Sequence, residues 1–127
     1  MVKSAAILFG LVFLVVGILG FVPAATPVTD GMPMLLGIFH VNAAHNVVHL
    51  ASGIVFLLCG LAGAGASRAF FKIFGIVYAI VAIWGFVAGN GNTLFVVSNN
   101  PAVTWLHVVL ALAMLFLGFG TRDTATA

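Results

Sequence analysis

The stretch Leu8–Val22, LFGLVFLVVGILGFV, decides the fold, because the chain contains it twice. The second copy, Ile73–Val87, reads IFGIVYAIVAIWGFV and aligns without gaps, with eight of fifteen positions identical. Neither copy contains a charged residue. A long, uninterrupted apolar run is typical of a helix that crosses the hydrocarbon core of a bilayer. We therefore interpret the two copies as two related membrane spans.

The segment that follows each copy is repeated as well. Asn42–His49, NAAHNVVH, fits Asn100–His107, NPAVTWLH. Each repeat then contains two spans, so both repeats enter the membrane in the same sense and are related by a pseudo-twofold axis along the membrane normal. The sequence predicts tandem helical hairpins, repeat 1 over residues 5–62 and repeat 2 over residues 69–120.

These repeats predict an all-α membrane protein, a single domain over residues 1–127 that forms a four-helix bundle. Pro23–Asn42 is expected to lie in the membrane interface or against the bundle, and Gly63–Arg68 is expected to be a small-residue link. A short tail follows at residues 121–127. The four predicted spans are residues 5–22, 43–62, 69–87 and 101–120.

The composition excludes several classes of protein. Of 127 residues, 64% are apolar and 5% are charged, against about 25% charged in soluble domains. A net charge of +2 is too small for a phosphate-tracking surface, so no nucleic-acid partner is expected. The single Cys59 cannot form an intrachain disulfide. The chain has no Glu, and Asp30 and Asp123 lie outside the spans, so no catalytic residues are assigned and no enzyme is expected.

The cations predict the orientation. Lys3, Arg68, Lys72 and Arg122 all fall on one side of the predicted spans. By the positive-inside rule this side is cytoplasmic, which places both termini in the cytoplasm. The first apolar run has 18 residues, more than the h-region of a cleaved signal peptide, so we expect it to remain as a span.

Small and polar residues at matched positions predict how the helices pack. Asn42 and Asn100 each precede a span and can cap its first amides. Asn46 belongs to a polar face that is expected to look inward. Glycines let helix backbones approach closely in lipid. The matched glycines are Gly10 and Gly75, and Gly20 and Gly85.

The histidines carry the main chemical signal. His45 and His49 share a helix face, and His107 occupies the position that matches His49. One hypothesis is haem b with His49 and His107 as axial ligands, and another is a copper or zinc site at His45, His49 and His107, with His40 as a further ligand. The favoured interpretation is structural: the imidazoles hydrogen-bond within the bundle and fix its register.

Three aromatic side chains receive structural interpretations. Trp84, like Trp105, lies near the outer end of a span, where interfacial anchoring is expected. Tyr78 lies in mid-span and is expected to make a hydrogen bond in the core.

Leu36–Leu50, LGIFHVNAAHNVVHL, together with Trp105–Leu110, WLHVVL, resembles a bacterial family of small four-helix membrane proteins known as a domain of unknown function, number forty-three eighty-three. The resemblance covers most of the chain. It implies a fold and a place in the bacterial inner membrane, but no activity. Where the family tends to carry an Asp-Asn pair before the second histidine, this chain has Val103-Thr104. The matching positions are Val41, Asn42, His45, Asn46, Val48, His49, Leu50, Leu106 and His107.

Three functions follow from these features, in order of preference. The first is a non-catalytic accessory or structural membrane protein, packed against a larger complex or against copies of itself. The second is a haem or transition-metal carrier that uses His49, His107 and His45. The third is a small oligomeric channel, which would need a polar face of full membrane depth. The polar face that contains Asn46 ends below the histidines, where Phe56, Leu57 and Cys59 follow.

Overall fold

A computed structural model of the chain describes residues 1–29, 32–88 and 99–121, and contains four long helices in this part. Asp30, Arg122, Asp123 and the predicted tail beyond Thr121 lie outside the described residues. The helices are α1 (Val2–Leu19), α2 (Ala43–Ala62), α3 (Ala64–Ala88) and α4 (Pro101–Phe119). Between α1 and α2 lie the short 3-10 helix η1 (Pro23–Ala25) and the strands β1 (Val28–Thr29), β2 (Met32–Leu35) and β3 (Phe39–His40).

All four helices are long and apolar enough to cross a membrane, which confirms the predicted number of candidate spans. Large apolar side chains cover the outside of the bundle; Leu61 is 74% exposed and Val87 is 80% exposed. Such a surface is stable in lipid and not in water. The second and fourth spans agree with the prediction to within one residue, whereas α1 begins and ends three residues earlier than predicted.

The prediction of a small-residue link at Gly63–Arg68 is wrong, because α3 already begins at Ala64. Gly63 alone turns the chain, with a φ of 141° that L side chains rarely adopt. The Ser67 hydroxyl then donates to the carbonyls of Gly63, at 2.8 Å, and Cys59, at 3.1 Å. Alanine is the best helix former, so Ala64 and Ala66 extend the helix where small size alone had indicated a loop.

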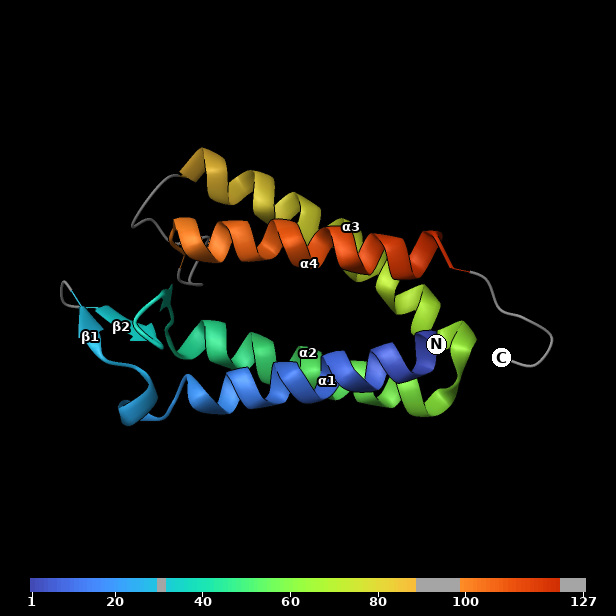
Figure 1. Cartoon of the computed structure of the whole chain (residues 1–127), viewed down its shortest axis with the longest axis horizontal. Helices are drawn as coiled ribbons and strands as arrows, with labels where there is room; N and C mark the ends of the chain where they lie inside the picture. Colours follow the sequence, from blue (N-terminus) through green and yellow to red (C-terminus); the bar gives the residue numbers. More distant parts are fainter. Residues whose placement is uncertain (30–31, 89–98, 122–127) are drawn as a thin grey trace.

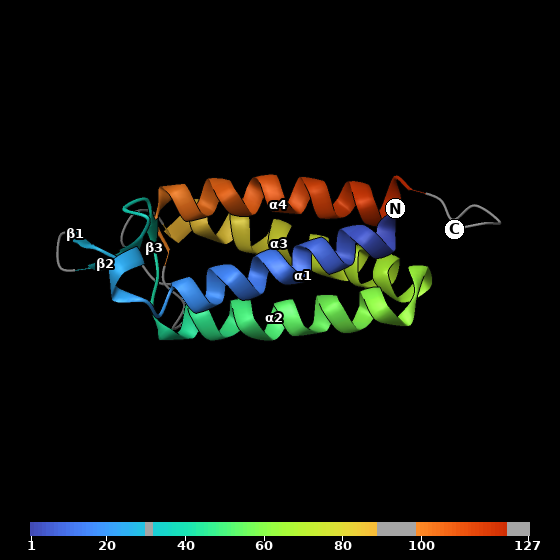
Figure 2. The same cartoon turned by 60° about the horizontal axis from the view of Figure 1, so that its bottom comes forward.

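The four helices form two hairpins. α1 packs along α2 and α3 packs along α4, while contacts between the hairpins are fewer (Figure 1). The N-terminus and the α2–α3 turn lie at one end of the bundle, and the strands lie at the other (Figure 2). From their shared turn, α2 and α3 diverge toward the end with the strands (Figure 1).

Glycines bring the helix backbones into contact within each hairpin. A Cβ at Gly53 on α2 would lie 2.9 Å from the Gly10 carbonyl oxygen and 3.0 Å from the Leu14 nitrogen on α1. On α3, a Cβ at Gly75 would lie 3.0 Å from the Leu115 nitrogen of α4. These contacts agree with the packing expected for Gly10 and Gly75, since only a residue without a side chain permits so close an approach.

The other two matched glycines approach side chains and not backbones, which corrects the expectation for them. Gly20 caps α1, its nitrogen donating to the Val16 carbonyl at 3.0 Å, and a Cβ there would collide with the Asn46 amide. A Cβ at Gly85 would lie 2.5 Å from the Thr104 hydroxyl oxygen. Both positions leave room for a polar side chain of the neighbouring helix.

Both predicted asparagine caps are present. The Asn42 side chain accepts a hydrogen bond of 2.8 Å from the His45 backbone nitrogen, and Asn100 accepts one of 2.9 Å from Val103. Each cap satisfies one of the amides that the first turn of a helix leaves without a partner. The caps fix the start of α2 and of α4, and with it the height of the histidines that follow.

Phenylalanines fill the interior toward the α2–α3 turn. Phe56 of α2 has no exposed surface, and its ring lies 5.6 Å from Phe9 of α1 and 4.7 Å from Phe70 of α3. Phe71 and Met114 are also fully buried. This part of the core is apolar and joins all four helices.

The connection between α1 and α2 folds into a small antiparallel sheet of order β1-β2-β3, which the sequence analysis did not predict. Leu36 (φ 54°) and Gly37 (φ 74°) turn the chain between β2 and β3. The connection lies against the start of α4, since the Asn100 amide donates to the Ile38 carbonyl at 3.1 Å. The sheet therefore covers the end of the bundle at which the histidines lie.

Candidate functional site

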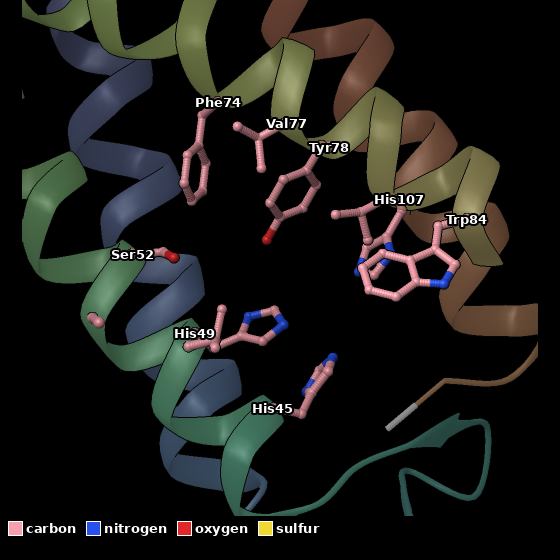
Figure 3. Close-up of a pocket in the computed structure, with 11 residues that line it drawn as sticks. His45, His49, Ser52, Phe74, Val77, Tyr78, Trp84 and His107 are labelled. Atoms are coloured by element: carbon pink, nitrogen blue, oxygen red, sulfur yellow. The ribbon is translucent and has the colours of Figure 1, made fainter. Parts of the chain in front are cut away.

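A partly open pocket of about 370 Å³ lies where α2 and α3 diverge (Figure 3). The divergence itself explains the pocket, because the two helices belong to different hairpins and contact each other less than the helices within each hairpin do. None of the described residues that line it is charged. They are His45, Val48, His49, Ala51 and Ser52 from α2, Phe74, Val77, Tyr78, Val81 and Trp84 from α3, and His107 from α4.

Three imidazoles in this pocket are buried. His45, His49 and His107 are 6%, 5% and 7% exposed. The His45 and His49 rings lie 4.4 Å apart, and the His107 ring meets the edge of Tyr78 at 5.1 Å. The His45 and His49 rings lie on the α2 side of the pocket, because the two residues are four positions apart on one helix face and the Asn42 cap fixes where that helix begins.

The Nδ1 atoms of these three imidazoles have no hydrogen-bond partner among the described residues. A buried polar group without a partner destabilises a protein by about 1–3 kcal/mol. Native structures therefore leave few such groups, and those that remain call for an explanation such as a ligand or an ordered water. Three such atoms border one pocket, which makes this pocket the candidate site.

The structure places three of the four predicted ligand residues in one pocket and leaves His40 outside it. In the described part of the chain, no three His, Cys, Asp or Glu side chains are arranged to hold a metal ion, so the predicted copper or zinc site gains no support. His40 lies on β3, outside the pocket lining, with its Nδ1 atom 3.2 Å from the Asn99 carbonyl oxygen. His49 and His107 do line the same pocket, and their use as haem ligands stays a prediction.

The α3 wall is the part of the site that the sequence analysis missed. Tyr78 and Trp84, interpreted as a core residue and an interfacial anchor, both line the pocket, and the Tyr78 hydroxyl points into it (Figure 3). Phe74, Tyr78 and Val81 recur at intervals of three or four residues, which places them on one helix face. That spacing is the signal from which an aromatic wall could have been found.

The fold and the pocket define a membrane protein of four helical spans with an uncharged site between two hairpins. The chain belongs to the family described as Domain of unknown function (DUF4383), which it matches over residues 3–120. This confirms the family resemblance of the sequence. No curated protein and no solved structure matches the chain.

Proposed function

We propose that this protein is a non-catalytic membrane protein that binds a small lipid-soluble molecule between α2 and α3. The observation that carries the proposal is the set of three buried imidazoles, His45, His49 and His107, with unpartnered Nδ1 atoms in one pocket. The pocket volume of about 370 Å³ falls within the range of small-molecule sites, roughly 300–1,000 Å³. Apolar walls and a few converging polar atoms are the usual composition of such a site.

The lining favours binding over catalysis. The lining residues that the structure describes offer imidazoles, the hydroxyls of Tyr78 and Ser52, and apolar contacts, but neither a carboxylate nor an amine. A catalytic histidine is commonly oriented by a hydrogen bond from its second ring nitrogen to a carboxylate, and the described lining offers no carboxylate for this purpose. A channel is not favoured either, because Phe56, Phe71 and Met114 fill the interior below the pocket. An accessory role in a larger complex or a homo-oligomer is compatible with ligand binding and belongs to the same proposal.

We further propose that the two termini face the cytoplasm of a bacterial cell and that the pocket opens in the outer half of the membrane. Lys3 lies on the first turn of α1, against Gly60 near the end of α2, and Arg68 and Lys72 lie on the first turns of α3. The described cations therefore gather at the end opposite the strands, which the positive-inside rule assigns to the cytoplasm.

The contacts of the two hairpins support their origin as a duplicated unit. Gly10 packs on Leu57 in the first hairpin, and its counterpart Gly75 packs on Leu115 in the second. Each partner occupies the position that the sequence alignment of the repeats assigns to it. The same correspondence holds for Gly20 with Asn46 and Gly85 with Thr104, and for Gly60 with Ile7 and Gly118 with Lys72.

Native mass spectrometry of the protein purified from its own membrane in mild detergent tests the proposal. We expect one small lipid-soluble molecule bound per chain. The variant Val81→Trp should lose it, because the larger side chain fills the pocket that Val81 lines. The control Val109→Trp makes the same change on the outer surface of α4, where Val109 is 61% exposed, and should keep the molecule.

Finding the protein without a bound molecule in every preparation would contradict the proposal. Equal amounts of bound molecule in Val81→Trp and Val109→Trp would contradict it as well. The visible spectrum and metal content of the same sample test the carrier hypothesis. We expect no Soret band and no stoichiometric copper or zinc. A Soret band lost in both His49→Ala and His107→Ala would instead establish haem, because bis-imidazole ligation needs both nitrogens.

A further inference from the structure

We propose that the molecule is of the quinone class, a flat ring that carries two oxygens on opposite edges and an apolar tail. This inference rests on the proposed function and names the ligand chemistry of the same pocket. It follows from three features of the pocket: the shape between its walls, the positions of its hydrogen-bonding atoms and the absence of charge from its described lining.

The two walls of the pocket suit a flat ring. Imidazoles from α2 stand on one side, and Phe74, Tyr78 and Trp84 from α3 stand on the other (Figure 3). Aromatic side chains favour stacked or edge contacts with a further ring, and these contacts add to the apolar burial. A flexible acyl chain would gain less from walls made of rings.

The polar atoms lie on two sides of this space. His45 and His49 belong to α2, whereas His107 belongs to α4 and lies across the pocket from them (Figure 3). A neutral imidazole donates through one nitrogen and accepts through the other. It can therefore bind a ring carbonyl as donor or a ring hydroxyl as acceptor. A ligand with a single oxygen would leave one side without a partner.

The charge distribution excludes an anionic lipid headgroup as the occupant. Lys3 and Arg68 lie toward the opposite end of the bundle, and no cation is among the described lining residues. At the mouth, Val48 and Val77 are 44% and 41% exposed, so an apolar tail that leaves the pocket here would contact lipid. The molecule is neutral and amphipathic, with its ring inside.

Isothermal titration calorimetry in detergent, with menadione as the quinone probe, tests this inference. Methylnaphthalene, which has the same rings without the oxygens, is the matched ligand control. We expect menadione to bind about tenfold more tightly, since two hydrogen bonds separate the probes. The preference is the ratio of the affinity for menadione to that for methylnaphthalene. In His49→Phe and in His107→Phe this preference should fall to about threefold or less, because each variant loses one hydrogen bond to the quinone. His40→Gln, outside the pocket, should keep the full preference.

A variant that fails to fold is replaced by His49→Gln or His107→Gln, whose amide restores a donor and should keep most of the preference. Equal binding of menadione and methylnaphthalene by the unmodified protein would overturn the quinone assignment. If the molecule found by mass spectrometry were still lost in Val81→Trp, the proposed function would stand and only the ligand class would be wrong. A preference that survives both phenylalanine substitutions would also overturn the assignment.

Discussion

Replacing Gly53 by leucine should force α1 and α2 apart and destabilise the bundle by more than about 3 kcal/mol. A Cβ at this position would lie 2.9 Å from the Gly10 carbonyl oxygen and 3.0 Å from the Leu14 nitrogen. Both atoms belong to the backbone of α1 and cannot rotate away. Gly53→Ala should already destabilise the protein by about 1–3 kcal/mol, since one methyl group overpacks the crossing.

Unfolding of the purified protein in a detergent titration measures these effects. Gly65→Ala is the matched control, because Gly65 is also helical and a Cβ there meets nothing within 4 Å. We expect the control to stabilise the protein by up to about 1 kcal/mol through helix propensity alone. Equal stability of the Gly53→Leu variant and the unmodified protein would show that the hairpin does not pack as described.

Replacing Phe56 by alanine should destabilise the protein by about 3 kcal/mol. Phe56 has no exposed surface, and its ring contacts those of Phe9, Phe13 and Phe70 at centroid distances of 5.6, 5.4 and 4.7 Å. In a bilayer the transfer of apolar surface contributes little, because lipid is itself apolar. The expected effect comes from the cavity and the lost dispersion contacts, which places it at the lower end of the range for buried phenylalanines.

The same titration with Phe116→Ala provides the comparison, because Phe116 is 62% exposed on the outside of α4. That change should alter the free energy of unfolding by less than about 1 kcal/mol. Similar losses for Phe56→Ala and Phe116→Ala would mean that the aromatic core contributes no special stability.

The spans were the most predictable part of this molecule. Their length and apolarity follow from the thickness of the bilayer, so α2 and α4 agree with the prediction to within one residue. The asparagine caps were also predictable, since Asn42 and Asn100 need only their own helix to act. The start of α3 was not, because small residues such as Ala64 suit both a helix and a loop. The positive φ of Gly63, which decides between them, is a property of the turn.

Only the histidines of the candidate site could be predicted from the sequence. The spacing of His45 and His49 shows that they share a face, and the repeat places His107 at a matching height. The α3 side of the pocket faces these histidines because of the way the two hairpins diverge. The periodicity of residues within one helix carries no information about that divergence. Tyr78 and Trp84 were therefore interpreted one at a time, although they border the same pocket. Similarly, the contact of His40 with Asn99 joins residues 59 positions apart and has no local signal.

Nitrogen-15 NMR of the histidine side chains tests the central claim most directly. Protein stripped of lipid in detergent is compared with the same protein after addition of a lipid extract of its native membrane. We predict that the ring resonances of His45, His49 and His107 shift on addition, as their nitrogens gain hydrogen-bond partners. His40, whose Nδ1 atom already lies 3.2 Å from the Asn99 carbonyl oxygen, should not change. Resonances of the three pocket histidines that stay unchanged at saturating extract would contradict a ligand-binding role for this pocket.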